Sequence, residues 1–366
     1  MKKLFVIIFL SVTLGACNNK NFSIADKFKT IQPLTHKVFE VQNGANELLN
    51  PIAIAISGNT LTTQNSMTPD VFTTIDIATG RIIKHWGTKG QGPNEFSGRI
   101  DMNNNYLETG LNIWCVSLSK LYFFPNSDLE SGLIHFQNIP VNINDDRLDI
   151  YNSVIQLDTF VFFASGGNND KLFTLLDTKN NMIKEVGDYP PEDKTEVDKN
   201  LPPILRKMAY NGRLKYNHSL KKLVYISIAS EMFEIYNFDG ADVELAMGNY
   251  STIPKYEEVA RANTGNVVTR SVVPNLINGK GRNLSVTSSD ENIFILYQDY
   301  RKMKIEEGSQ PGNKANIILV FDWDGKPVKK YELDRIINGQ ITYDKERNRL
   351  WAIHDNPDPE VIYFQL

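Results

Sequence analysis

The chain repeats one short pattern along most of its length: an apolar strand, a turn rich in Asp, Asn or Gly, and a second strand with alternating polar residues. The pattern is clearest at residues 72–87, 172–187, 233–245 and 317–331, and a weaker copy covers 121–136. Asp-Gly and Asn-Asn pairs suit these turns because they tolerate the positive φ of tight hairpins. A further apolar strand precedes each hairpin, so each repeat predicts three or four antiparallel strands.

The spacing of this repeat indicates a β-propeller. The hairpin turns fall near residues 80, 132, 180, 240 and 325. A four-stranded blade needs about 40–50 residues, so the first three intervals each accommodate one blade. The longer last interval contains two segments typical of insertions, a predicted short helix at 253–261 and a polar stretch at 304–313. A third insertion at 188–207 includes a predicted helix at 204–208.

The two ends of the chain are expected to share the last blade. Residues 340–343, 349–353 and 361–365 provide three strands, and the strand Lys37–Val41 has no partner nearby in the sequence. Pairing them completes a sixth blade and removes the open sheet edges that promote aggregation. We therefore predict an all-β, six-bladed β-propeller over residues 31–366. The alternative is seven blades, with the extra blade within residues 250–285.

The first residues have the pattern of an export signal. Lys2 and Lys3 precede an apolar run that is too short to span a bilayer, which is typical of a secretory signal peptide. The run ends in Leu14-Gly15-Ala16-Cys17, which resembles the lipobox of bacterial lipoproteins. The resemblance implies cleavage after Ala16 and diacylation of Cys17, with residues 17–30 as lipidated cysteine and polar tether. The alternative is an ordinary signal peptide with a chance cysteine.

The composition narrows the compartment and the partners. The chain carries 43 acidic and 39 basic side chains, a formal net charge of −4, so no nucleic-acid surface is indicated. No acidic cluster follows Cys17, which favours the periplasmic face of the outer membrane over the cell surface. Cys115, the second of two cysteines, lies in an apolar strand, where a buried structural thiol is expected rather than a nucleophile.

A glycine-rich motif covers residues 86–96, Trp-Gly-Thr-Lys-Gly-Gln-Gly-Pro-Asn-Glu-Phe. Gly90 and Gly92 are expected to take positive φ in a tight turn, with Phe96 as an anchor between blades. The alternative is a nest of backbone amides that binds an anion. No Gly-Lys-Ser or Gly-Lys-Thr follows, which excludes a phosphate-binding loop of the Walker type.

This motif resembles the Gly-Gln-Gly-Pro-x-Glu-Phe signature of NHL-type propellers. With the lipobox and the blade pattern, the whole chain is similar to a family of six-bladed, TolB-like propeller lipoproteins of Gram-negative anaerobes. The resemblance implies a fold and a location in the cell envelope. Members of that family are largely of unknown function, so it implies no catalytic residue.

The sequence shows no catalytic or metal-binding set. The five histidines include no pair at metal-ligand spacing, no Gly-x-Ser-x-Gly element is present, and no cofactor is indicated. By analogy with other propellers, we expect a functional site at the axis, where the innermost strands of the blades converge. Polar residues predicted to meet at one channel mouth are therefore the candidate ligand-binding residues: Arg99, Asp101, Asn152, Lys215, Tyr216, Arg282, His354 and Asp355. The plainer alternative is that these are ordinary polar residues of loops.

Two functions follow from these observations. The first is a non-enzymatic binding or scaffold protein, anchored to the outer membrane, that recognises a peptide, protein or glycan. Tyrosine stacks on such ligands, while Asn and Arg donate hydrogen bonds to them. The alternative is a hydrolase or lyase whose metal-assisted site forms at the axis from residues of different blades.

Overall fold

The structure is a computed structural model. It describes residues 23–42, 48–66, 68–92, 94–104, 107–141, 151–167, 170–190, 203–262, 268–275, 279–303, 312–355 and 358–366. The expected signal peptide and Cys17 lie outside these residues, as do most of the insertion at 188–207 and residues 304–311 of the insertion at 304–313.

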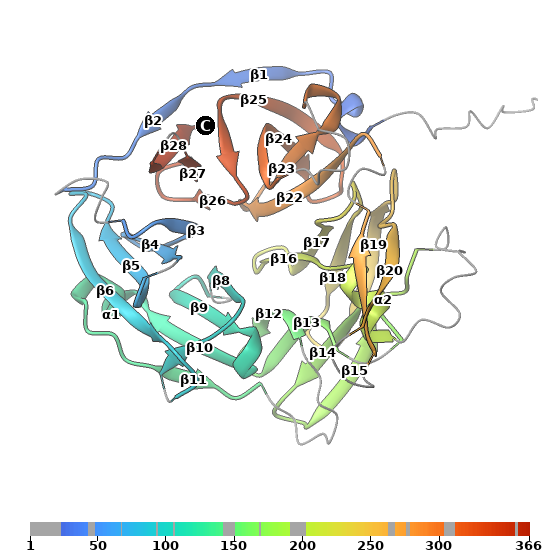
Figure 1. Cartoon of the computed structure of the whole chain (residues 1–366), viewed down its shortest axis with the longest axis horizontal. Coiled ribbons are helices and arrows are strands. Elements are labelled where there is room, and N and C mark those ends of the chain that lie inside the picture. The colour runs from blue at the N-terminus through green and yellow to red at the C-terminus, as the bar shows by residue number, and fades with distance from the viewer. Residues whose placement is uncertain are drawn as a thin grey trace, which may run out of the picture.

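Six mainly antiparallel sheets surround a central axis, which confirms the predicted six-bladed β-propeller (Figure 1). Blade 1 contains β3 (Pro51–Ser57), β4 (Thr60–Asn65), β5 (Asp70–Asp76), β6 (Ile82–Lys89) and β7 (Glu95–Phe96). Blade 2 contains β8 (Ile100–Asn104), β9 (Gly110–Cys115), β10 (Lys120–Pro125) and β11 (Gln137–Ile139). Blade 3 contains β12 (Tyr151–Asp158), β13 (Val161–Gly166), β14 (Phe173–Asp177) and β15 (Met182–Val186).

The second half of the ring has the same plan. Blade 4 contains β16 (Gly212–Asn217), β17 (Lys222–Ser227), β18 (Phe233–Phe238) and β19 (Val243–Asn249). Blade 5 contains β22 (Gly281–Ser288), β23 (Asn292–Asp299), β24 (Lys314–Asp322), β25 (Pro327–Asn338) and β1 (Ile31–Leu34). Blade 6 contains β26 (Ile341–Asp344), β27 (Arg349–Asp355), β28 (Pro359–Gln365) and β2 (His36–Val38).

The core lies between neighbouring blades. Phe163 and Phe173 of blade 3 pack against Tyr225 and Tyr236 of blade 4, and all four side chains are buried. Because each blade is covered on both faces, its middle strands are buried at nearly every position rather than at every second one, even where they carry threonines as β4 does. All six residues of β9 are buried, including Cys115, as the apolar strand predicted.

The N-terminal segment closes the ring as predicted. Strand β2 pairs antiparallel with β28, with Lys37 opposite Tyr363, and the amide of Phe39 donates a 2.9 Å hydrogen bond to the carbonyl oxygen of Val361. Strand β1 also runs parallel to β25 as a fifth strand of blade 5, which was not predicted. The segment therefore covers the outer edges of two blades (Figure 1).

Residues that the sequence analysis placed in a polar tether belong to the packed fold. The short 3₁₀ helix η1 (Ile24–Lys27) buries Ile24 completely between blades 4 and 5. The ring of Phe28 meets that of Phe321 edge-on at 5.0 Å. Residues from Ser23 onward thus belong to the packed domain, and the stretch available as a tether is shorter than 17–30, because this segment carries apolar side chains that the ring can bury.

Two local predictions were wrong. Residues 253–261, predicted as a short helix, contain the strand β20 (Tyr256–Ala262), which pairs with β21 (Val268–Pro274) as a separate two-stranded sheet. Its partner strand contains three valines, and this pairing outweighs the helix propensity of the Glu and Ala residues in β20. Among the described residues this hairpin makes no seventh blade.

The second error concerns the expected turn at residue 132. The helix α1 (Asn126–Ser131) follows β10 there, ends at Gly132 with φ of 72°, and shifts the outer strand to β11.

The predicted helix at 204–208 is confirmed as α2 (Pro203–Ala209).

Candidate ligand-binding site at the propeller axis

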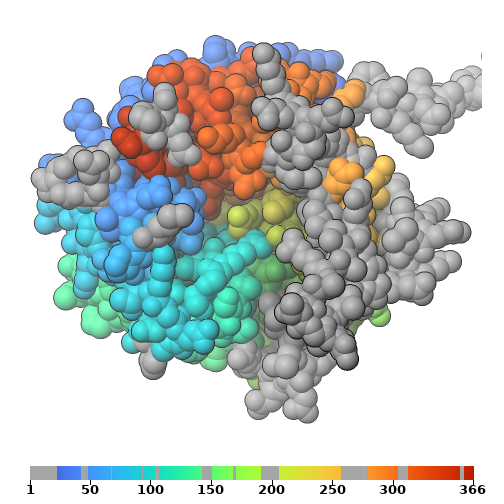
Figure 2. Space-filling view, viewed as in Figure 1, coloured from blue at the N-terminus to red at the C-terminus, as the bar shows by residue number. Residues whose placement is uncertain are grey.

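The axis contains a cavity of about 700 Å³ to which all six blades contribute. The first strand of each blade lies nearest the axis (Figure 1). The residues that line the cavity lie towards the ends of these strands, so the cavity opens on the face where they end, called here the cavity face. The opposite face, where these strands begin, is the start face. In the space-filling view, blade 4 is seen recessed at the centre of the ring, between the neighbouring blades (Figure 2). One residue from each blade illustrates the lining: Ile54, Asn103, Gln156, Tyr216, Ser289 and Tyr343.

Lys215 lies at the floor of this cavity. Its Nζ donates a 2.5 Å hydrogen bond to Oδ1 of Asn103, which connects blade 4 with blade 2 across the axis. Burial of the ammonium lowers the pKa of Lys215 to about 8; Asp101 opposes this shift, while Arg213 adds to it. At neutral pH the lysine is therefore still mostly protonated and can bind an anion.

More charged groups lie along the axis beyond Lys215. The carboxylate of Asp101 is 3.6 Å from Nη1 of Arg213 and accepts a hydrogen bond from the hydroxyl of Ser153. Nη1 of Arg99 donates a 3.1 Å hydrogen bond to Oδ1 of Asn211. Burial, and then repulsion from Arg213, lowers the pKa of Arg99. Three cations here face one carboxylate among the described residues.

Acidic side chains line the rim of the cavity, and one lysine forms ion pairs with two of them. Nζ of Lys345, in blade 6, lies 2.8 Å from Asp290 of blade 5 and 3.8 Å from Glu108 of blade 2. The hydrogen bond to Asp290 is the main reason why the pKa of Lys345 is raised. These ion pairs are about half exposed, so each contributes little stability and can exchange partners.

Two tyrosines form part of the cavity wall. Tyr343 stacks on Phe294 with ring centroids 5.3 Å apart and an interplanar angle of 23°. Tyr216 meets Phe238 edge-on, and burial raises its pKa to about 12. Burial also raises the pKa of Tyr343, so both phenols stay protonated at neutral pH. The Tyr343 hydroxyl donates a 3.0 Å hydrogen bond to Oδ1 of Asn348.

The predicted site residues do not meet at one mouth. Lys215 and Tyr216 line the cavity, whereas Arg99, Asp101 and Asn152 lie near the start face, where their strands begin. The prediction treated all residues close to an innermost strand as neighbours. A strand rises about 3.3 Å per residue, so positions at the two ends of one strand lie on different faces.

The remaining predicted residues lie away from the cavity. Arg282 is 3% exposed and donates hydrogen bonds to Gln298, to the carbonyl oxygen of Gly312 and to Asn313. His354 is buried on β27, and its Nδ1 donates a 2.7 Å hydrogen bond to the carbonyl oxygen of Ile336 in blade 5. Asp355 ends β27, opposite Pro359. These two residues end the second strand of their blade, which does not line the axis.

Several residues of the axial region were missed by sequence reasoning. They are Asn103, Gln156, Asn211, Arg213, Asp290 and Lys345. A signal for some of them was available, because polar residues alternate at positions 99, 101 and 103 and again at 213 and 215. In a strand this period of two places side chains on one face.

The glycine-rich motif forms a structural turn. The amide of Gly92 donates a 2.7 Å hydrogen bond to the carboxylate of Glu95, so the chain's own side chain takes the position that an anion would occupy in a nest. Phe96 is buried against Phe72 and Trp86. The expected positive φ at Gly90 and Gly92 is wrong, since positive φ occurs at Gly87 and Asn94 instead. A Cβ at position 90 would lie 1.9 Å from Oε2 of Glu95, so a larger residue there would displace the end of that side chain.

Two searches of the described residues are negative. They contain no group of three or more His, Cys, Asp or Glu side chains arranged to hold a metal ion. None of the helices in this part of the chain is long and apolar enough to cross a membrane.

Comparisons with known proteins agree with the observed architecture. A solved structure of a DUF4221 family member from Bacteroides vulgatus ATCC 8482 is similar, with a TM-score of 0.54 and 12% identity over 92% of this chain and 94% of that chain. A candidate exported protein from Bacteroides fragilis NCTC 9343 gives a TM-score of 0.52 and 10% identity over 92% and 99% of the two chains. At these identities the likeness shows the fold alone. A comparison with curated proteins finds no match.

The amino-acid sequence matches one protein family over most of its length. Residues 28–345 match the family described as TolB-like 6-blade propeller-like. The match includes strands of all six blades and nearly every residue that lines the axial cavity. The chain therefore belongs to the TolB-like 6-blade propeller-like family.

Proposed function

We propose that this protein is a non-enzymatic binding propeller, held in the cell envelope by a lipid on Cys17, which recognises a peptide, protein or glycan in its axial cavity. The observation that carries the proposal is the cavity of about 700 Å³ on the cavity face. Its volume is in the range of about 300–1,000 Å³ typical of small-ligand sites. Its walls combine apolar side chains, tyrosines, amides and a lysine, which is a surface suited to a polar ligand with some apolar area.

Lipid anchoring is supported by the sequence Leu14-Gly15-Ala16-Cys17. The periplasmic face of the outer membrane is the location that we propose, because no acidic cluster follows Cys17. Labelling with a clickable palmitate analogue in a Gram-negative host, followed by membrane fractionation, tests this. We expect the wild-type chain to be labelled and membrane-bound, and Cys17→Ala to lose both properties. A Cys17→Ala variant that stays in the membrane fraction contradicts the anchor.

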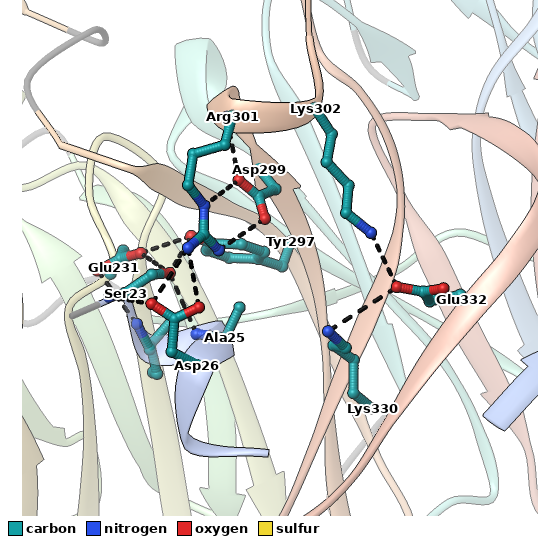
Figure 3. Close-up of polar contacts among 11 residues, drawn as sticks. Ser23, Ala25, Asp26, Glu231, Tyr297, Asp299, Arg301, Lys302, Lys330 and Glu332 are labelled. Atoms are coloured by element: carbon teal, nitrogen blue, oxygen red, sulfur yellow. Dashed lines mark hydrogen bonds and ion pairs between the residues drawn. The ribbon is translucent and has the colours of Figure 1, made fainter. Parts of the chain in front are cut away.

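The docked N-terminal segment supports a defined orientation. Ser23 contacts Glu231, in the connection between β17 and β18, and the neighbouring Asp26 contacts Arg301, just after β23 (Figure 3). Both of these positions belong to the start face. Cys17 precedes Ser23 by six positions, so at full extension they are at most about 20 Å apart. A lipid on Cys17 would therefore keep the start face towards the membrane and the cavity open to the periplasm.

Ligand capture is tested with the full chain on glycan and peptide arrays. Ser219 is an exposed residue of the cavity lining, so Ser219→Trp should obstruct the cavity without disturbing the core. Ala241→Trp, in an exposed outer turn, is the matched control. We expect captured ligands to be lost with Ser219→Trp and retained with Ala241→Trp. Equal capture by both variants contradicts binding in the cavity, and turnover of a captured ligand with a stoichiometric metal would identify a hydrolase or lyase instead.

A further inference from the structure

The axis holds more positive charge than its own carboxylates neutralise. Arg213 lies within electrostatic range of both Arg99 and Lys215, and Asp101 is the one carboxylate that interacts with these cations among the described residues. Its two oxygens are already used, one by Arg213 and the other by the hydroxyl of Ser153. The cluster therefore carries an excess of about two positive charges at neutral pH.

One of these cations has an unused donor. Nη2 of Arg99 is buried and has no hydrogen-bond partner among the described residues, while its Nη1 donates a hydrogen bond to Asn211. A buried polar group without a partner costs about 1–3 kcal/mol, and more when it is charged. Like charges gathered in a partly buried site add a repulsive cost. An anion bound beside these groups would lower the repulsive cost.

Access to this cluster runs through the cavity. Lys215 and Asn103 form its floor, and Arg213 precedes Lys215 by two positions on the same strand, towards the start face. A group entering from the cavity face therefore meets the Lys215 ammonium first, with the guanidinium groups beyond it. Glu108 and Asp290 make the rim of the cavity acidic, although Lys345 pairs with both of them. The rim therefore repels large polyanions, whereas a longer ligand with a single anionic group can still enter.

We infer that the axis contains an anion-binding site, in which Lys215 contacts a carboxylate or phosphate group of the ligand and Arg213 and Arg99 reinforce the positive potential. This inference rests on the proposed binding function and names the class of group that is recognised. Asn103 positions the lysine, and the tyrosines of the wall contact the uncharged part of the ligand. Uronic-acid glycans, peptides with an acidic residue or free C-terminus, and phosphorylated compounds share this chemistry.

Calorimetric titration of the full-length protein in detergent tests the site. The probes are trigalacturonate and neutral maltotriose, the peptide Ala-Ala-Glu and its fully amidated counterpart, and inorganic phosphate. We expect at least one anionic probe to bind about tenfold or more tightly than its neutral counterpart, because a hydrogen bond to a charged group is gained. Added salt should weaken that binding. The probe that binds distinguishes glycan, peptide and phosphate sources.

Two variants locate the binding. Lys215→Met removes the ammonium, and Asn103→Asp keeps the lysine but places an internal carboxylate against it. Each variant should lower the affinity for the anionic probe about tenfold or more. Lys326→Met, in an exposed turn of blade 5, is the control and should leave the affinity unchanged. Asn103→Asp retains nearly the original volume, so the test survives if Lys215→Met fails to fold.

The outcomes separate this inference from the binding function. If neutral probes bind as tightly as anionic ones and are lost with Ser219→Trp, the anion site is refuted while cavity binding stands. If an anionic probe binds but both axial variants leave its affinity unchanged, the site is refuted at this position. If an anionic probe is lost with Lys215→Met and Asn103→Asp but unaffected by Ser219→Trp, the anion site stands and the proposed route through the cavity is refuted.

Discussion

The hydroxyl of Ser23 donates a 2.6 Å hydrogen bond to the carboxylate of Glu231, a residue 208 positions further along the chain (Figure 3). Tyr297 donates to the same carboxylate at 2.5 Å, and the amide of Ile24 approaches its second oxygen at 3.4 Å. Glu231 is fully buried, and this burial raises its pKa. The N-terminal segment thus binds blades 4 and 5 through η1, and its next strands pair with blades 5 and 6. It therefore stabilises the closed ring at two separate places.

Replacing Ser23 by Ala should weaken this fastening. The change leaves Glu231 with one fewer donor and also removes the cap of η1, where the Ser23 hydroxyl accepts a hydrogen bond from the amide of Ala25. We expect the free energy of unfolding to fall by about 1–3 kcal/mol, measured by urea denaturation. Ser127→Ala, at an exposed position of α1, is the control. Equal stability of the two variants contradicts a structural role for the hydrogen bond.

Removing the N-terminal strands should open the ring. A chain that starts at Ser23 retains η1, β1 and β2 and should unfold at the same temperature as a chain that starts at Cys17. A chain that lacks residues 1–42 loses the strands that cover β25 and β28. Its exposed edges should lower the unfolding temperature and promote aggregation, measured by scanning calorimetry and light scattering. A monomeric, equally stable truncated protein would show that closure by β2 is dispensable.

Glu234 should make the protein less stable as the pH rises from about 4.5 to about 6. This buried carboxyl accepts hydrogen bonds from the hydroxyls of Tyr236 at 2.7 Å and Tyr250 at 2.8 Å, yet burial raises its pKa to about 6. Because the folded chain binds this proton more tightly than the unfolded chain, stability is highest below the unfolded pKa and falls as the pH rises through the folded one.

The loss in the free energy of unfolding that Glu234 causes is about 2 kcal/mol, because burial raises its pKa from 4.5 to about 6. Urea denaturation of the wild type and of Glu234→Gln, at several pH values across this window, measures it. The difference in the free energy of unfolding between the two proteins should change by this amount and then level off. Parallel pH profiles would show that Glu234 has the same pKa in the folded and unfolded chains.

Gly90→Ala should destabilise the glycine-rich turn through contact with one side chain. The added Cβ would lie 1.9 Å from Oε2 of Glu95, so that carboxylate must move and give up its hydrogen bond to the amide of Gly92. We expect a loss of about 1–3 kcal/mol in the free energy of unfolding. The double variant Gly90→Ala, Glu95→Ala should lose less than the sum of the single variants. Additive losses would show that the glycine is needed for another reason.

Much of the fold follows from local patterns. Alternating and apolar strands, together with turn residues such as Gly80 and Gly325, which take positive φ, define where most strands begin and end. The unpaired strand at 37–41 was enough to predict how the ring closes. The errors at 253–261 and near residue 132 arose where a strand partner or a helix depends on contacts outside the segment.

The sequence by itself determined a ring of six sheets, because strand period, turn chemistry and repeat length are properties of neighbouring residues. Only the tertiary structure decided what lies at the axis. Asn103 and Lys215 are 112 positions apart and meet because the ring brings the innermost strands of blades 2 and 4 together at the axis. The direction of each innermost strand then decides which of its residues reach the cavity face, and that direction is set by packing of whole blades rather than by any short stretch of the chain.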